Sequence, residues 1–154
     1  MIVITGKKHV GKTTVLKKVL SGLKKDVYGI ISESIEDGYR VEDLKTGEKR
    51  ILASKKKIGF KLKGYYFDPK ALTFIEKALS RKGDILIYDE IGHLETRGII
   101  DISPHLRDNA IVIVRKDKLD KFLRKVENYK VFTVTERNRN KISEAILVSC
   151  NEFI

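Results

Sequence analysis

The chain has 154 residues, of which 42% are hydrophobic, and a formal net charge of +11. This length and composition predict one self-folding domain over residues 1–154 and argue against a disordered chain. Cys150 is the only cysteine, which excludes an internal disulfide, and no apolar run approaches the ~20 residues of a membrane span. We therefore expect a cytoplasmic protein without a membrane partner, either a monomer or a weak oligomer.

Strand and helix patterns alternate in the first half of the chain. Residues 2–5 form a short apolar run typical of a strand buried on both faces, and apolar residues then recur at helical spacing from Val15 to Leu23. Residues 27–32 predict a second strand. Residues 39–53 are more polar and predict a hairpin at one edge of the sheet, with its turn at Thr46-Gly47. We interpret residues 58–67 as irregular or extended.

The second half continues the alternation. Asp68-Pro69 is typical of a helix start, and Gly83 is expected to end that helix. The further expected elements are a strand at 85–88, a helical turn at 103–104, a strand at 110–114, a helix at 119–126, a strand at 131–134 and a helix at 140–147. This order predicts an α/β fold with a mostly parallel sheet.

A glycine-rich loop lies between the first strand and the first helix. Residues 6–13 read GKKHVGKT, which is the spacing of a phosphate-binding loop. Gly6 and Gly11 allow the backbone to point successive N–H groups at a phosphate, and the helix that starts near Lys12 adds its positive dipole end. The loop and its flanking elements therefore predict a nucleotide site.

Each side chain of the loop has an expected role. Lys12 reaches the β- and γ-phosphates, the Thr13 hydroxyl binds Mg²⁺, and Thr14 is an additional donor toward the α-phosphate. The spacing does not fix the identity of Lys7, Lys8 and His9, which either add positive charge toward a triphosphate or face water. The expected nucleotide-binding residues are Gly6, Lys7, Lys8, His9, Val10, Gly11, Lys12, Thr13, Thr14 and Arg139.

Two carboxylates follow the strand at 85–88. Asp89 ends a buried strand at the edge where α/β sheets bind ligands, so we expect it to hold Mg²⁺, together with Thr13. Glu90 is expected to accept a hydrogen bond from a water lined up with the γ-phosphate and to orient or deprotonate it. The expected catalytic residues are thus Glu90 and Lys12, although a solvated strand end is the other interpretation of Glu90.

Several motifs together resemble the small P-loop nucleoside-triphosphatases first described in thermophiles, a family that includes the vertebrate cancer-related nucleoside-triphosphatase. GKKHVGKTT is similar to the family's G-x-P-G-V-G-K-T-T, with Lys8 and His9 in place of Pro-Gly. DEIGHLE at 89–95, GIISES at 29–34, DLKTGE at 43–48 and TERNR at 135–139 also match family motifs. The chain is shorter than the family pattern after Glu95.

The resemblance implies a RecA-like P-loop fold with an extra strand between the loop strand and the Asp89 strand. It also implies slow, Mg²⁺-dependent hydrolysis of ATP, GTP and other nucleoside triphosphates with loose base preference.

Other residues are weaker candidates. Arg97, Arg137 and Arg139 are each candidates for stabilising charge on the transferred phosphoryl group, and Arg139 alternatively stacks on the base. Glu33 follows a strand and is a candidate for ordering water or metal, whereas the spacing of His93 and His105 predicts no metal site. Tyr65, Tyr66 and Phe67, beside Lys61 and Lys63, resemble a base-stacking patch, although the pattern favours a core role for at least two of the three.

Three functions remain open from sequence alone. Hydrolysis is favoured because Glu90 supplies a place for water beside the metal-binding Asp89. A small-molecule or polynucleotide 5′ kinase is the alternative, but no arginine-rich lid segment is evident. The third is a nucleotide-controlled module that binds RNA or another polyanion, for which the charge of +11 is the motivation.

Overall fold

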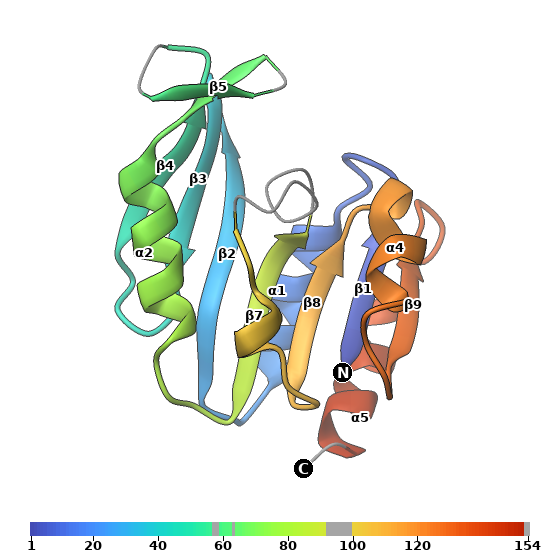
Figure 1. Cartoon of the computed structure of the whole chain (residues 1–154). Coiled ribbons are helices and arrows are strands. Elements are labelled where there is room, and N and C mark those ends of the chain that lie inside the picture. The colour runs from blue at the N-terminus through green and yellow to red at the C-terminus, as the bar shows by residue number, and fades with distance from the viewer. Residues whose placement is uncertain (57–58, 63, 92–99, 153–154) are drawn as a thin grey trace.

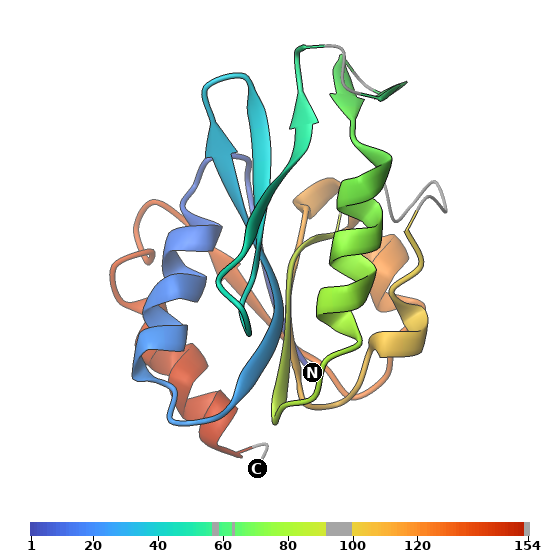
Figure 2. The ribbon, with the colours of Figure 1, turned by 90° about the vertical axis from the view of Figure 1, so that its left-hand side faces the viewer.

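The computed structural model describes residues 1–56, 59–62, 64–91 and 100–152. Within these ranges the strands form one nine-stranded sheet in the order β5-β6-β4-β3-β2-β7-β8-β1-β9. Helices cover both of its faces (Figures 1 and 2). The predicted α/β class is confirmed.

The half of the sheet that carries the loop is parallel. Its strands are β1 (Ile2–Gly6), β2 (Val27–Ile35), β7 (Ile85–Ile91), β8 (Ala110–Val114) and β9 (Lys130–Val134). β8 lies between β1 and β7 and is parallel to both. The extra strand implied by the family resemblance is therefore present.

The other half is antiparallel and larger than the single hairpin that we predicted. It contains β3 (Gly38–Asp43), β4 (Lys49–Ser54), β5 (Phe60–Leu62) and β6 (Tyr65–Phe67). The hairpin of β3 and β4 is confirmed, but its expected place at the edge is wrong, because β6 pairs with β4 and β5 lies outermost. The stacked rings of Phe60 and Phe67, 5.7 Å apart, hold this added pair of strands together.

Two layers of helix complete the fold. The helices are α1 (Lys12–Gly22), α2 (Pro69–Leu79), α4 (Leu119–Leu123) and α5 (Ile142–Glu152), with 3₁₀ turns η1 (Ser103–His105) and η2 (Lys116–Lys118). Figure 2 shows α1 and α5 on one face and α2, η1 and α4 on the other. Alternate residues of β1 serve the two cores, because Ile2 and Ile4 pack toward α1 and α5 while Val3 packs toward α2.

Helix boundaries differ from the predicted ones in α2, α4 and α5; α4 ends at Leu123 rather than at 126, and α5 begins at Ile142 rather than at 140. Asp68 caps α2 as expected, by accepting from the Lys70 N–H at 2.9 Å, but the helix ends at Leu79 rather than near Gly83. Arg81 leaves the helix because its Nε donates to the buried carboxylate of Asp43 at 2.7 Å. Helix α5 continues past residue 147 to Glu152, since Ser149 and Cys150 are buried against the sheet.

Among the described residues, no helix is both long enough and apolar enough to cross a lipid bilayer.

Gly29 is the position where β2 tolerates no side chain. Its φ is +115°, and a Cβ built there would lie 1.9 Å from the Ile87 carbonyl oxygen on neighbouring β7. We predict that Gly29→Ala lowers the free energy of unfolding by about 3 kcal/mol or more, because both strain and overlap oppose it. Gly47→Ala is the control, since Gly47 also has positive φ (+74°) but an added Cβ meets nothing within 4 Å. Urea unfolding measures both, and equal losses would contradict this packing.

Candidate functional site

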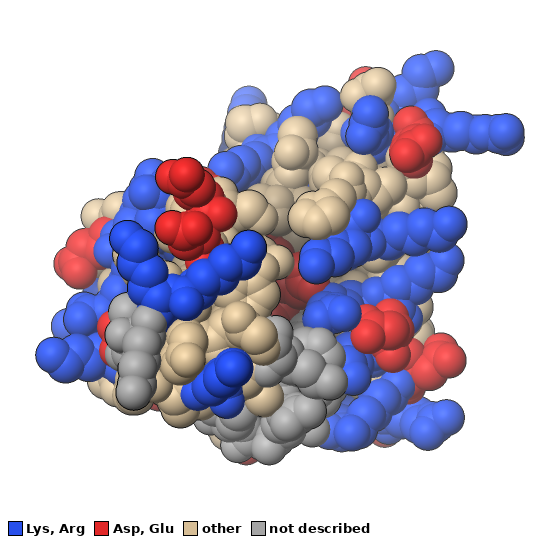
Figure 3. Space-filling view, turned by 90° about the horizontal axis from the view of Figure 1, so that it is seen from above, with Lys and Arg blue, Asp and Glu red and all other residues tan. Residues whose placement is uncertain are grey.

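The carboxyl ends of the parallel strands meet at the upper edge of the sheet in Figure 1. A cleft of about 870 Å³ lies there, between the glycine loop and the antiparallel strands. Seen from above, Lys and Arg side chains stand on both sides of a hollow that contains acidic atoms (Figure 3). This is the position at which α/β sheets bind ligands.

The glycine loop presents an open helix N-terminus to the cleft. Gly11 is the N-cap of α1 with φ 107°, and no side chain of the described residues caps the helix. The first-turn N–H groups are therefore free for an anion. Gly6 is packed so closely that an added Cβ would lie 2.7 Å from the Val134 carbonyl oxygen. Both glycines are needed for the shape of the loop, as predicted.

Lys12 is folded over this loop. Its side-chain ammonium donates to the Gly6 carbonyl oxygen at 2.8 Å and to that of Lys7 at 3.4 Å, and the residue is only 8% exposed. Both of these hydrogen bonds go to neutral carbonyl oxygens, whereas the carboxylates of Asp89 and Glu90 interact with Lys12 through their charge. The loop thus holds a positive charge ready for a phosphate.

Asp89 joins the loop to the end of β7. The Thr13 hydroxyl donates to Asp89 Oδ2 at 2.9 Å, and the Ser32 N–H donates to the same oxygen at 3.3 Å. The Ser32 hydroxyl also donates to the Asp89 carbonyl oxygen at 2.5 Å. These contacts fix the carboxylate directly beside the first turn of α1.

The other oxygen of the Asp89 carboxylate is buried without a hydrogen-bond partner among the described residues. Burial raises the pKa of Asp89 to about 7, against the opposing effect of the Thr13 hydrogen bond. Within the described residues, no three His, Cys, Asp or Glu side chains are placed to hold a metal by themselves. The donor set of one carboxylate and one hydroxyl fits Mg²⁺, which takes its remaining ligands from phosphate and water.

Glu90 lines the cleft next to Asp89. The pairing of β7 with β8 shifts register between Asp89 and Ile91, so Glu90 lies at an irregularity in the strand. Its carboxylate oxygen is 3.9 Å from Nε of Arg115, which directly follows β8. Burial raises the pKa of Glu90, whereas the charges of Lys12 and Arg115 oppose that rise. A carboxylate thus faces the cleft between two cations.

The structure brings most of the predicted site residues together. The predicted residues that line the cleft are Gly6, Lys7, Lys8, His9, Gly11, Lys12, Thr13, Thr14, Asp89 and Glu90. The Val10 side chain instead packs in the core under the loop. Arg139 lies beside the loop, where its Cδ would be 3.8 Å from a Cβ on Gly11.

A short turn places Arg139 there. The Asn138 side chain accepts from the Thr135 N–H at 2.8 Å, and the Arg139 N–H donates to the Thr135 carbonyl at 3.0 Å. The TERNR motif thus builds a turn that carries Arg139 beside Gly11. Arg137 of the same motif is exposed.

The weaker candidates have other partners. Glu33 lines the cleft but is paired with Arg40, which lowers the pKa of its carboxyl. His105 contacts Glu76 at 2.6 Å. Tyr66 lies under the Lys61 ammonium, 5.9 Å from it, whereas Tyr65 and Phe67 line the cleft. The predictions for Lys63, His93, Glu95 and Arg97 concern residues outside the described ranges.

Sequence reasoning missed Ser32 and Arg115. Both follow the rule that identified Asp89, because each lies at or near the carboxyl end of an apolar run: VYGII for Ser32 and AIVIV for Arg115. For Arg115, the available signal in the sequence was a basic residue directly after the apolar run AIVIV. Strand order then decides which strand ends become neighbours, and the sequence does not state that order.

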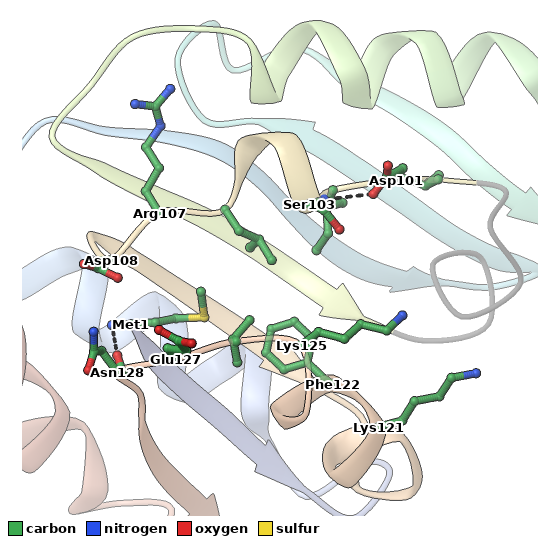
Figure 4. Close-up of a pocket in the computed structure, with 14 residues that line it drawn as sticks. Met1, Asp101, Ser103, Arg107, Asp108, Lys121, Phe122, Lys125, Glu127 and Asn128 are labelled. Atoms are coloured by element: carbon green, nitrogen blue, oxygen red, sulfur yellow. Dashed lines mark hydrogen bonds between the residues drawn. The ribbon is translucent and has the colours of Figure 1, made fainter.

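A second cavity, of about 490 Å³, lies at the amino end of β1 (Figure 4). Met1, Glu127 and Asn128 are at one end of it and Lys121 and Lys125 at the other. Its lining, among the described residues, includes neither a glycine loop nor the N-terminus of a long helix. The candidate phosphate site is therefore the cleft and not this cavity.

Comparison with known proteins agrees with this geometry. The family model described as NTPase matches residues 1–147. The nucleoside-triphosphatase THEP1 of Thermotoga maritima is 32% identical over 163 residues, covering 95% of this chain and 92% of the relative. THEP1 of Methanocaldococcus jannaschii is also 32% identical, over 164 residues, covering 95% and 94%.

A solved structure gives the same result. The crystal structure of THEP1 from the hyperthermophile Aquifex aeolicus matches with a TM-score of 0.78 and 26% identity, covering 97% of this chain and 99% of that one. The family match spans nearly the whole chain and includes both the loop and the carboxylates. The chain therefore belongs to the NTPase family.

Proposed function

We propose that this protein hydrolyses nucleoside triphosphates, ATP and GTP among them, to the diphosphate and phosphate in a slow, Mg²⁺-dependent reaction. The observation that carries the proposal is the Glu90 carboxylate, which lines the same cleft as the glycine loop and interacts with the charges of Lys12 and Arg115. A carboxylate in that place has a water molecule, rather than a phosphate, as its natural partner.

The loop binds the triphosphate. N–H groups at the N-terminus of α1 donate to phosphate oxygens, and the Lys12 ammonium exchanges its two carbonyl contacts for the β- and γ-phosphates. Thr14, exposed at the first turn, donates toward the α-phosphate. The nucleotide's base then lies near Arg139, whose planar guanidinium stacks on any base; this accounts for loose base preference.

Thr13 and Asp89 would hold Mg²⁺, and the partnerless oxygen of Asp89 supports this role. When bound, the cation supplies positive charge against the phosphate oxygens. In the reaction, Glu90 accepts a proton from the attacking water as the new oxygen–phosphorus bond forms. The bond between the γ-phosphorus and the bridging oxygen breaks, and the diphosphate leaves with that oxygen. Lys12 and Arg115 stabilise the charge that develops.

The first prediction separates binding from chemistry. Lys12→Ala removes the cation at the loop and should abolish nucleotide binding, whereas Glu90→Gln should keep binding and lower kcat by about 10²–10⁴-fold. Calorimetry with Mg²⁺ and a non-hydrolysable triphosphate, together with phosphate release, measures both. Lys24→Ala, an exposed lysine just after α1, is the control. Unchanged turnover in Glu90→Gln would show that Glu90 does not activate water, and transfer to an added acceptor without hydrolysis would favour a kinase.

The second prediction concerns Asp89 in the absence of divalent cations. Its buried carboxylate costs stability because one oxygen has no partner in the described structure. Asp89→Asn should therefore raise the free energy of unfolding at neutral pH by about 1 kcal/mol. Thermal unfolding in EDTA measures this. Added Mg²⁺ and triphosphate should stabilise the wild type but not the variant, and equal stabilisation of both would remove Asp89 from the cation site.

The third prediction concerns the role of Arg115 in the hydrolysis step. Arg115→Ala should lower kcat by about 10²–10³-fold with little change in nucleotide affinity, because its charge is needed most when the phosphoryl group transfers. The guanidinium is otherwise engaged at 3.2 Å with Asp117 and at 3.9 Å with Glu90. Steady-state kinetics measure the change, with the exposed Arg124→Ala as control. A raised KM at constant kcat would limit Arg115 to ground-state binding.

A further inference from the structure

The cleft is longer than a triphosphate site needs to be. Beyond Glu90 it continues toward the antiparallel strands, where its walls become apolar and aromatic. The residues that line this part are Tyr39, Leu52, Leu62, Tyr65, Phe67 and Ile75. We call these six residues the aromatic end of the cleft. Four strands, β3, β4, β5 and β6, contribute to it together with α2.

Two tyrosine rings are the main feature of the aromatic end. The rings of Tyr39 and Tyr65 are 5.6 Å apart and inclined at 60°, and both side chains are half-buried. The rings contact each other from different strands, β3 and β6. A pair of half-buried rings that lines a cleft offers a flat ligand an aromatic surface.

The aromatic end adjoins the γ-phosphate end of the loop. The charges of Glu90 and Arg115 both act on the Tyr39 hydroxyl, whose pKa is raised chiefly by burial. Tyr39 also lines the same cleft as the residues proposed to act on the γ-phosphate. A ring placed on the tyrosines would have its polar edge near Glu90.

The base of the hydrolysed nucleotide has a different place. Arg139 lies beside Gly11 and is not among the residues that line the cleft. A triphosphate whose γ end faces Glu90 extends away from the tyrosines along the loop, toward the Thr14 side. As far as the described residues go, the aromatic end is thus left uncovered when the nucleotide is bound in the proposed position.

We propose that the aromatic end of the cleft binds the nucleobase of a second ligand, either a free nucleoside or nucleotide or the end of a single-stranded RNA. Stacking on Tyr65 and Tyr39 recognises the ring, and the Tyr39 hydroxyl and Arg115 supply hydrogen-bonding groups for its polar edge. Lys8, Arg115 and Lys116 along the same cleft suit a ligand that also carries phosphate. The inference rests on the proposed position of the triphosphate.

The test uses full-length protein saturated with Mg²⁺ and a non-hydrolysable triphosphate. 2-Aminopurine riboside is titrated in, and its fluorescence is expected to be quenched as the ring stacks. Saturation by the triphosphate is verified separately by calorimetry, so failure of the loop site and failure of the second site are distinguishable. Quenching that occurs with the nucleotide-free protein but not with the saturated protein would mean that the tyrosines hold the nucleotide's own base, and the proposal would be overturned.

Variants assign the site to Tyr65. Tyr65→Ala should weaken riboside binding about 5- to 150-fold, the range for loss of one stacking partner, whereas Tyr65→Phe should retain it. Tyr129→Ala removes a ring that is 43% exposed and does not line the cleft, and it should change nothing. Basal phosphate release should be normal in all three, which verifies that they are folded. Equal affinity in Tyr65→Ala and wild type would overturn the proposal.

A second binding experiment distinguishes the two kinds of ligand, a free nucleoside or nucleotide and the end of an RNA strand. A short single-stranded RNA with 2-aminopurine at its 5′ end is compared with the riboside. Equal affinities assign the site to free nucleosides, whereas tighter RNA binding that weakens with salt assigns it to a strand end. Quenching of neither probe would overturn the assignment to a nucleobase.

Discussion

The contact between Thr13 and Asp89 is the interaction on which the site depends. It joins the first turn of α1 to the end of β7, two segments that are 76 residues apart in sequence, at a distance of 2.9 Å. It does so with a buried carboxylate that retains one partnerless oxygen among the described residues. Such a group opposes folding, so its presence favours a functional origin, and a cation with a phosphate ligand would satisfy it.

The fold makes this contact possible by inserting β8 between β1 and β7. The insertion widens the edge of the sheet, so that the loop after β1 and the carboxylates at the end of β7 line one cleft. It also brings Arg115, which directly follows β8, to 3.9 Å from Glu90. The antiparallel strands then extend the cleft on the Glu90 side with aromatic walls. One sheet edge thus combines a phosphate cradle, a cation site and an apolar surface.

The sequence predicted those parts of the site that local patterns encode. The loop from Gly6 to Thr13 and the Asp89-Glu90 pair have fixed spacing next to strands, so both were identified. Arg115 and Ser32 were missed because their role depends on strand order. For the outer hairpin of β5 and β6, the sequence predicted only irregular or extended structure. Its strands have three residues each and rely on cross-strand aromatic pairing, which a short sequence pattern does not reveal. The end of α2 was misplaced because Arg81 has a tertiary partner, Asp43, which helix propensity does not describe.

The most direct test is a crystal structure with Mg²⁺ and a non-hydrolysable triphosphate. The account predicts that the phosphates lie on the N-terminus of α1 and that the Lys12 ammonium has left the Gly6 carbonyl for the γ-phosphate. It also predicts a water between the γ-phosphate and the Glu90 carboxylate. A triphosphate bound elsewhere, or Lys12 still bonded to Gly6 with the nucleotide in place, would contradict it.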